Sequence, residues 1–157
     1  MMKSNLLILE IDKEIARKRI AELESEIIAL GPKFREAFTQ TSETWHDNAP
    51  FEAVRDHQSL LDAERQNLKL ILRNSLPSIP KQKKGVVGVG SKVKIINIKT
   101  NKTTTYFIAG DWTSRAGNKA DGVIIISRQS PLALNLIDKK IGDEIHFINL
   151  FKIETIE

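Results

Sequence analysis

Hydrophobic residues in the first half of the chain recur every three or four positions, which is the period of an α-helix. The first series comprises Ile8, Ile11, Ile15, Leu23, Ile27, Leu30, Phe34 and Phe38. Pro32 directly follows Gly31 inside this series. Because proline lacks an amide donor and clashes with the preceding helical turn, we expect a kink or a break there. The pattern predicts a helix over about residues 10–43 that is interrupted near Pro32.

A second helical series begins after a short polar segment. Its members, at nearly heptad spacing, are Phe51, Val54, Leu61, Leu68 and Leu72. Pro77 and Pro80 then end the helix. Residues 41–50, between the two series, are rich in residues that cap helices or form turns. Two narrow hydrophobic stripes joined by a short loop predict an antiparallel helical hairpin over residues 1–79, with the loop at an exposed tip.

The second half of the chain has the short hydrophobic runs and turn residues that are typical of β-strands. We expect strands over residues 93–98, 103–109, 123–127, 144–150 and 151–156, with Asn101 in the first turn. Residues 131–137 predict one short helix, with Ser130 as its N-cap and Pro131 in its first turn. The sequence therefore predicts an α+β protein, in which residues 80–157 form a small antiparallel sheet with one helix.

The amino-acid composition disfavours several classes of protein and of metal site. The 157 residues are 41% hydrophobic and 28% charged, which is typical of a folded chain. No hydrophobic run approaches the ~18 residues of a membrane span, and the start lacks the features of a signal peptide, so we expect a cytoplasmic protein. The absence of cysteine excludes disulfides, thiolate metal sites and cysteine nucleophiles. The three scattered histidines disfavour a histidine metal site.

Positive charge is concentrated in the second half. Residues 1–79 contain 11 Lys/Arg and 13 Asp/Glu, whereas residues 80–157 contain 13 and 7. A mildly basic half suits contact with nucleic acid or with an acidic protein surface, and it also serves solubility alone. Residues 85–90, Gly-Val-Val-Gly-Val-Gly, match neither the dinucleotide fingerprint nor the P-loop. We expect these glycines to open the first strand instead.

Two carboxylates, Glu43 and Asp47, lie beside Trp45 in the loop expected at the hairpin tip. One interpretation is helix capping, because Asp47 or Asn48 suits the N-cap of the second helix and Pro50 suits its first turn. The other interpretation is delivery of carboxylates to the metal site of a partner. Two carboxylates alone bind Mg²⁺ weakly, since this ion keeps most of its waters. The partner would then supply the remaining ligands for two-metal chemistry.

Two separated segments carry motifs of a known family. The first is Asp47-Asn48-Ala49, followed by Phe51, Ala53, Arg55 and Gln58. The second comprises Ser130-Pro131-Leu132-Ala133, Leu136-Ile137-Asp138-Lys139 and Gly142-Asp143. In these motifs and in the order of its parts, the chain resembles the Gre transcript-cleavage factors of bacterial RNA polymerase. Asp47 stands at the position of a glutamate in that family, and Phe51 at the position of a tyrosine.

The resemblance implies an N-terminal antiparallel coiled coil and a C-terminal domain that is similar to FKBP-type isomerases. The implied partners are bacterial RNA polymerase and its nascent RNA, with no membrane and no small-molecule substrate. The C-terminal domain would dock on the polymerase through Ser130, Pro131, Leu132 and Ala133. The coil would enter the secondary channel, with Arg55 near displaced RNA. Its tip acids would help to place a Mg²⁺ ion held mainly by the polymerase, so the chain is expected to be a cofactor of RNA cleavage and not an enzyme.

The tip departs from the family at one position. The first acid of the family motif falls on Thr44, whose neutral hydroxyl is a poor Mg²⁺ ligand, and Glu43 is the next residue back. The candidate catalytic positions are therefore Asp47, Glu43 and Thr44, with Asp47 and Glu43 as metal ligands in the complex. This leaves two functions open: a factor that stimulates cleavage of backtracked RNA, and a channel regulator that does not. A prolyl isomerase is a third hypothesis, which rests on fold alone.

Overall fold

The computed structural model describes residues 5–43 and 49–157, excluding the side chains of residues 40–43. The chain separates into two compact units. The helical unit is Glu14–Arg73, and the β unit combines Met1–Lys13 with Asn74–Glu157. The segment before Glu14, which was expected to belong to the helical domain, is thus grouped with the second half of the chain.

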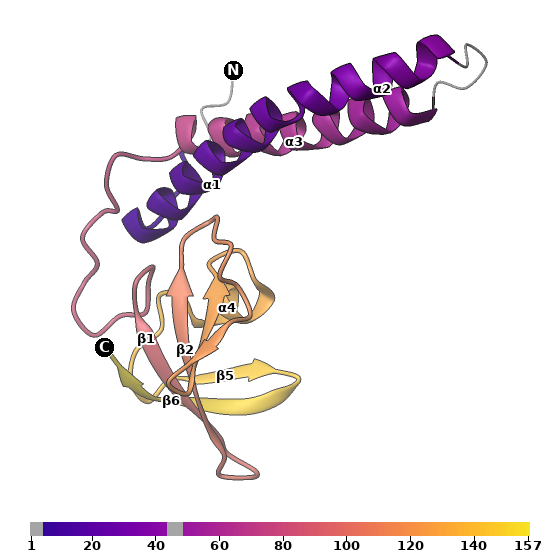
Figure 1. Ribbon diagram of the computed structural model, residues 1–157. Helices are drawn as coiled ribbons and strands as arrows, with labels where there is room; N and C mark the ends of the chain where they lie inside the picture. Colours follow the sequence, from indigo (N-terminus) through magenta and orange to yellow (C-terminus); the bar gives the residue numbers. More distant parts are fainter. Residues whose placement is uncertain (1–4, 44–48) are drawn as a thin grey trace. The chain divides into compact units, whose positions relative to one another are not determined.

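Three helices account for the first half of the chain: α1 (Glu10–Ala29), α2 (Gly31–Glu43) and α3 (Ala49–Arg73). The expected interruption near Pro32 is confirmed, because α1 ends at Ala29 and α2 begins at Gly31. Pro32 lies in the first turn of α2, where its missing amide hydrogen costs no helical hydrogen bond. Figure 1 shows α3 running back along α1 and α2. No helix in the described ranges has both the length and the hydropathy needed to cross a membrane.

The helical unit is held by a narrow seam of buried side chains. Along α1 and α2, and at Leu30 between them, the buried hydrophobic residues of this unit lie seven positions apart. They are Ala16, Leu23, Leu30 and Ala37. In α3 they are Leu61 and Leu68, which are again seven apart. A seven-residue hydrophobic repeat is the signature of a coiled coil, because it keeps one face of each helix turned toward its partner. The predicted antiparallel helical hairpin is confirmed.

A bidentate ion pair joins α1 to α3 beside this seam. Arg19 Nε donates to Glu64 Oε1 at 2.7 Å, and Arg19 Nη2 donates to Glu64 Oε2 at 2.9 Å. These hydrogen bonds are the main reason that the pKa of Glu64 lies below its ordinary value. Because the folded-state pKa is lowered, the pair stabilises the hairpin above the unfolded-state pKa. The stabilisation is lost as the pH falls through the folded-state pKa.

We expect the Arg19→Gln variant to raise the pKa of Glu64 toward its ordinary value. The variant should also lose about 0.5 kcal/mol of stability at neutral pH, a small amount because both side chains are partly solvated. Carboxyl ¹³C NMR titration gives the pKa, and thermal unfolding at neutral and acidic pH gives the stability difference. Arg35→Gln on α2 is the control, and it should leave the Glu64 titration unchanged. An unchanged Glu64 titration in Arg19→Gln would contradict this assignment.

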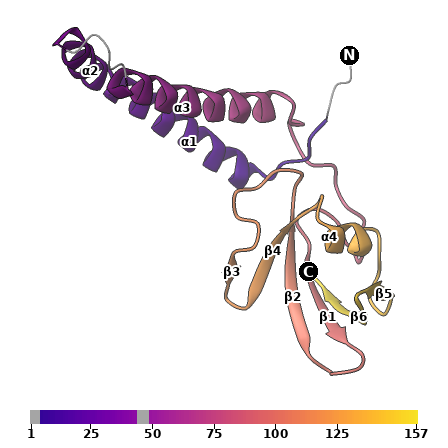
Figure 2. The same ribbon diagram turned by 90° about the vertical axis from the view of Figure 1, so that its right-hand side faces the viewer.

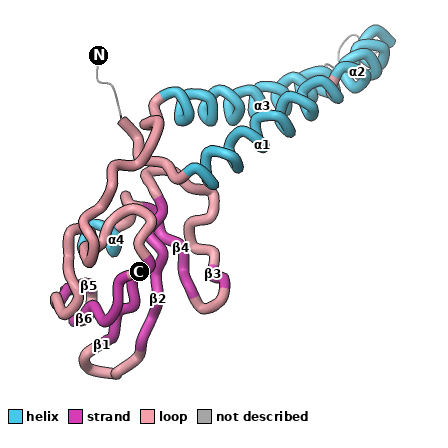
Figure 3. The backbone as a smooth tube through the Cα atoms, turned by 90° about the vertical axis from the view of Figure 1, so that its left-hand side faces the viewer, coloured by secondary structure: helices cyan, strands magenta, loops and turns pink. Residues whose placement is uncertain are grey.

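The β unit contains one six-stranded sheet with the strand order β3-β4-β2-β1-β6-β5. Its strands are β1 (Lys92–Asn97), β2 (Thr103–Ala109), β3 (Lys119–Ala120), β4 (Val123–Ser127), β5 (Glu144–Phe147) and β6 (Asn149–Ile156). The predicted short helix is present as α4 (Pro131–Leu136). Figure 2 shows β2 between β1 and β4, and Figure 3 shows α4 beside the strands of this unit.

The expectation of a purely antiparallel sheet is wrong, because β2 and β4 pair in parallel. Residues 110–122 connect these strands, and they carry the chain back to the end of the sheet at which β2 starts. Hydrophobic patterning identifies strands but does not give their direction. Two boundaries also differ from the expected ones. The last two strands meet at Ile148 instead of residue 150, and β1 begins at Lys92, after the Gly-Val segment at 85–90.

The core of the β unit lies between α4 and the sheet. In β1 only alternate residues, Val93 and Ile95, are fully buried, as expected for a strand with one face on the core. Ala133 and Leu136 of α4 belong to the same cluster. The other buried members are Val87, Ile108, Ile145 and Ile153. The predicted pairing of one helix with a small sheet is therefore confirmed.

The N-terminal segment completes the β unit through its backbone. Leu6 N donates to Asn74 O at 2.9 Å, and Leu76 N donates to Leu6 O at 2.8 Å. Gly110 passes so close to this segment that a Cβ atom there would lie 2.0 Å from Leu7 O. Only glycine fits at this crossing, because any larger residue would displace the Leu7 carbonyl. This contact explains why the residues before Glu14 pack with the second half of the chain.

Candidate functional site

The predicted catalytic positions follow directly from the end of α2. Glu43 is the last residue of α2, and α3 begins at Ala49. The side chain of Glu43 and the whole of Thr44 and Asp47 lie outside the described residues. The sequence therefore places the acids at the connection between α2 and α3. The arrangement of their carboxylates stays a prediction.

An aromatic pair joins α2 and α3. The rings of Phe34 on α2 and Phe51 on α3 are 5.7 Å apart and inclined by 67°. Edge-to-face aromatic pairs of this kind stabilise a contact beyond the area that they bury. Phe51 lies in the first turn of α3, so the pair holds the start of α3 against α2.

Arg55, the candidate RNA contact, lies on α3 with 59% of its side chain exposed. It forms an ion pair with the neighbouring Asp56, whose Oδ1 is 4.0 Å from Arg55 Nε. An exposed pair at this distance is weak. The guanidinium is therefore accessible to a phosphate, which it suits in geometry.

The predicted docking residues lie at the start of α4, and the structure gives them different environments. Ser130 is the N-cap, with Oγ accepting a hydrogen bond from Ala133 N at 3.2 Å. Ala133 is fully buried and packs in the core. Pro131 is exposed, and Leu132 packs partly against the core. The exposed apolar residues of α4 are therefore Pro131 and Leu134, which is 63% exposed and which sequence reasoning did not single out.

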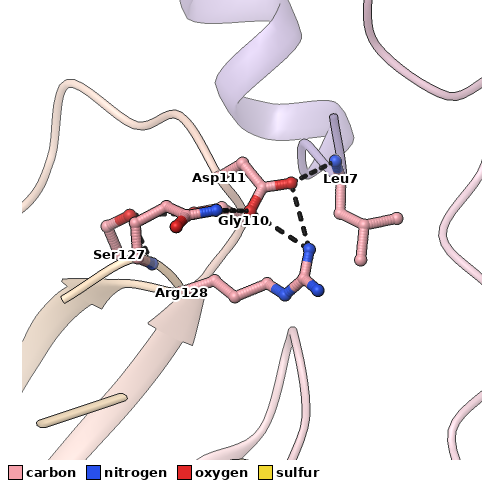
Figure 4. Close-up of polar contacts among 6 residues, drawn as sticks. Leu7, Gly110, Asp111, Ser127 and Arg128 are labelled. Atoms are coloured by element: carbon pink, nitrogen blue, oxygen red, sulfur yellow. Dashed lines mark hydrogen bonds and ion pairs between the residues drawn. The ribbon is translucent and has the colours of Figure 1, made fainter. Parts of the chain in front are cut away.

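A polar network holds the segment that leads into α4. The carboxylate of Asp111 accepts hydrogen bonds from Leu7 N at 2.7 Å, Arg128 Nη1 at 3.1 Å and Gln129 Nε2 at 2.7 Å. Figure 4 shows Asp111 between Leu7 and Arg128, with Ser127 beside Gly110. Arg128 and Gln129 directly precede the cap residue Ser130. Asp111 thus positions the entry to α4, and no local pattern marks it, because its backbone partner Leu7 is 104 residues away.

A second network involves the first turn of α1, which belongs to the β unit. Arg115 Nε donates to Asp12 Oδ1 at 2.8 Å, and Arg115 Nη2 donates to Asp12 Oδ2 at 3.1 Å. Thr113 Oγ1 adds a hydrogen bond to Asp12 Oδ1 at 2.9 Å. The side chain of Asp12 is fully buried, whereas that of Arg115 is 22% exposed. The hydrogen bonds to Asp12 raise the pKa of Arg115 above its ordinary value.

The described side chains contain no self-sufficient metal site. Within the described ranges, no group of three or more His, Asp or Glu residues is placed to hold a metal ion. The carboxylates of Glu43 and Asp47 are oxygen donors of the kind that Mg²⁺ prefers, but two are too few for a complete site. The donor set therefore fits a metal only if a partner supplies further ligands.

Comparison with known proteins gives consistent matches in both halves. A family model described as the C-terminal part of the transcription elongation factors GreA/GreB matches residues 81–155. GreA of Vibrio parahaemolyticus is 33% identical over 128 residues, which cover 79% of this chain and 78% of the relative. GreA of Helicobacter hepaticus is 36% identical over 103 residues, which cover 63% of this chain and 58% of the relative.

The extent of the matches varies. For some relatives the chain spans less than two thirds of their length, from 11% of GreA of Borreliella burgdorferi to 60% of GreA of Francisella philomiragia. A crystal structure of GreA factor homolog 1 of Thermus thermophilus is 17% identical, with 98% of this chain and 99% of that chain covered and a TM-score of 0.41.

Proposed function

Because the chain belongs to the GreA/GreB family of transcription elongation factors, we propose that it binds bacterial RNA polymerase through the secondary channel. There it stimulates Mg²⁺-dependent cleavage of backtracked nascent RNA. The polymerase carries out the cleavage, and this chain acts as its cofactor in the cytoplasm.

The observation that carries this proposal is the position of the candidate acids at the turn of a helical hairpin. The hairpin is braced by the seven-residue seam and by the pair of Phe34 with Phe51. A braced two-helix arm presents whatever lies at its turn with little loss of conformational entropy on binding. Glu43 and Asp47 are acids at that turn, so the arm is suited to deliver carboxylates into a partner.

Asp47 and Glu43 would hold the second Mg²⁺ ion together with ligands of the polymerase. In two-metal phosphoryl transfer, one ion would activate the attacking water molecule and the other would stabilise the leaving oxygen. The carboxylates of this chain would also accept hydrogen bonds from that water and so orient it toward the RNA phosphate. Arg55 would contact the phosphates of the displaced RNA, since its guanidinium is exposed.

Docking of the β unit on the polymerase would use the start of α4. Pro131 and Leu134 are its exposed apolar residues. Ser130, Leu132 and Ala133 would support this surface by capping the helix and packing it on the sheet. The Asp111 network would hold the preceding segment in place.

A cleavage assay tests this function directly. A stalled, backtracked complex of bacterial RNA polymerase with end-labelled RNA is incubated with the purified protein and Mg²⁺, and RNA lengths are measured over time. We expect the labelled RNA to shorten faster than in the polymerase alone. The proposal would be overturned if the RNA did not shorten and the protein did not compete with a known GreA factor for the complex.

Thr44 supports a second candidate function, in which the protein occupies the channel without promoting cleavage. A hydroxyl in place of the first acid weakens the carboxylate set that the reaction needs. In this case the wild type competes with GreA but leaves the RNA intact, whereas Thr44→Asp gains cleavage. Cleavage by the wild type at the rate of a known GreA factor would exclude this alternative.

A further inference from the structure

A basic depression lies on the β unit, where the connector before β1 meets the segment after α4. Its volume is about 570 Å³. It is lined by Lys81, Gln82, Lys83, Lys84, Val86, Asp138 and Lys140. We call Lys81, Lys83, Lys84 and Lys140 the lysine cluster. None of these residues has a part in the proposed function.

Backbone hydrogen bonds hold the two lysine-bearing segments together. Val87 N donates to Lys139 O, and Asp138 N donates to Val87 O, both at 2.9 Å. An isolated antiparallel bridge pairs Val86 with Lys140. The Gln82 side chain packs directly over Gly88, where an added Cβ would overlap its amide group. The lysine cluster is therefore assembled by the fold from residues far apart in the sequence.

The lysine cluster carries uncompensated positive charge. The ion pairs formed by lysines of the β unit, among the residues that the structure describes, involve Lys13, Lys92 and Lys94. Asp138 is the one acid that lines the depression. The nearby Asp143 carboxylate accepts a hydrogen bond from the backbone of Lys140 at 2.8 Å. Four ammonium groups against one lining carboxylate favour an anion in the depression.

The lining indicates which anion fits. Protein interfaces are depleted in lysine and enriched in arginine and aromatic residues, and none of these enriched types lines the depression. A nucleobase needs an aromatic or apolar surface for stacking, and Val86 is the one apolar lining residue. Phosphate oxygens, in contrast, are well served by flexible ammonium groups. The chemistry therefore matches a phosphodiester backbone better than an acidic protein or a free nucleotide.

We propose that the lysine cluster binds the phosphate backbone of nucleic acid without regard to base sequence. The choice of nucleic acid as the polyanion rests on membership of a transcription-factor family, but the binding itself needs no RNA polymerase. A test without polymerase therefore separates the failure of this inference from the failure of the proposed function.

Fluorescence anisotropy of a labelled single-stranded RNA, titrated with the full chain at several salt concentrations, tests the inference. One variant replaces all members of the lysine cluster by glutamine. The matched control replaces Lys99, Lys102, Lys119 and Lys152, which are exposed lysines of the same unit outside the depression. We expect the cluster variant to bind at least ~10-fold more weakly than the wild type. The slope of log binding constant against log salt concentration should fall in magnitude by up to ~3. The control should stay within about twofold of the wild type.

Three outcomes would overturn the inference. The first is an equal loss of affinity in both variants, which would indicate net charge alone. The second is displacement of the RNA by polyglutamate at equal charge concentration, which would indicate an acidic protein partner. The third is displacement by ATP at the concentration of the RNA, which would indicate a free-nucleotide site.

Lysine acylation footprinting of the wild type gives a test that depends on no variant. We expect bound RNA to protect the lysine cluster and to leave Lys99 and Lys119 reactive. Unprotected cluster lysines at saturating RNA would contradict the proposal, even if the affinity results agreed with it.

Discussion

We expect the Asp47→Ala variant to lose about 10²-fold in cleavage stimulation while keeping its affinity for RNA polymerase. The loss follows because Asp47 would be one of two carboxylates that this chain adds to the metal site, and removal of such a group typically costs one to two orders of magnitude or more. Affinity should persist because α4 and the coil surface are unchanged. Cleavage rates are measured on backtracked complexes, and affinity is measured by competition with wild type.

Two further variants separate metal chemistry from helix capping. Serine caps a helix about as well as aspartate but has no carboxylate, so Asp47→Ser should lose cleavage as Asp47→Ala does. Glu52→Ala removes an exposed acid in the first turn of α3 and should leave cleavage unchanged. Full cleavage by Asp47→Ser would show that Asp47 acts as a cap. A loss in Glu43→Ala equal to that in Asp47→Ala would identify Glu43 as the second acid.

We expect the Arg115→Met variant to lower the unfolding free energy of the β unit by about 3 kcal/mol. The variant leaves the fully buried Asp12 with Thr113 as its remaining side-chain partner. Breaking a buried pair by removing one partner costs more than the pair itself contributes, because a charge is left uncompensated. Denaturant titration followed by Trp112 fluorescence in a Trp45→Phe background gives the change, because Trp45 is the second tryptophan of the chain.

Two matched variants test the cause of this loss. Lys119→Met removes an exposed positive charge from the same unit and should cost less than about 0.5 kcal/mol. Adding Asp12→Leu to Arg115→Met should restore much of the stability, since no buried charge then remains. A single-variant loss as small as that of Lys119→Met would show that the pair is not a main support of this unit.

Local chemistry explains the parts of the fold that sequence reasoning predicted well. Pro32 interrupts the first helix at the expected place because proline acts on its own turn. Ser130 and Pro131 begin α4 as expected, because capping involves residues only three positions apart. The seven-residue seam was visible in part, since its members repeat along each helix. These features need no knowledge of distant contacts.

Long-range pairing explains what sequence reasoning did not predict. The parallel direction of β4 against β2 depends on the path of residues 110–122, which carries no directional signal. The membership of Leu6 and Leu7 in the β unit depends on partners that are distant in sequence. At the candidate site, Glu43 was expected in the loop at the tip, and it is instead the last residue of α2. The burial of Ala133 became apparent only once α4 was seen on the sheet.

The close contact of Leu7 with Gly110 also affects the order in which the chain folds during its synthesis. Arg115 follows Asp12 by 103 residues, so a ribosome adding about 5–20 residues per second needs roughly 5–20 s between the two. The contacts of the helical unit lie within Glu14–Arg73 and become available earlier, and helices form in microseconds. The N-terminal segment can pair with Asn74 and Leu76 as soon as the hairpin has emerged. Its contacts with Asp111 and Arg115 form only after those residues have been synthesised.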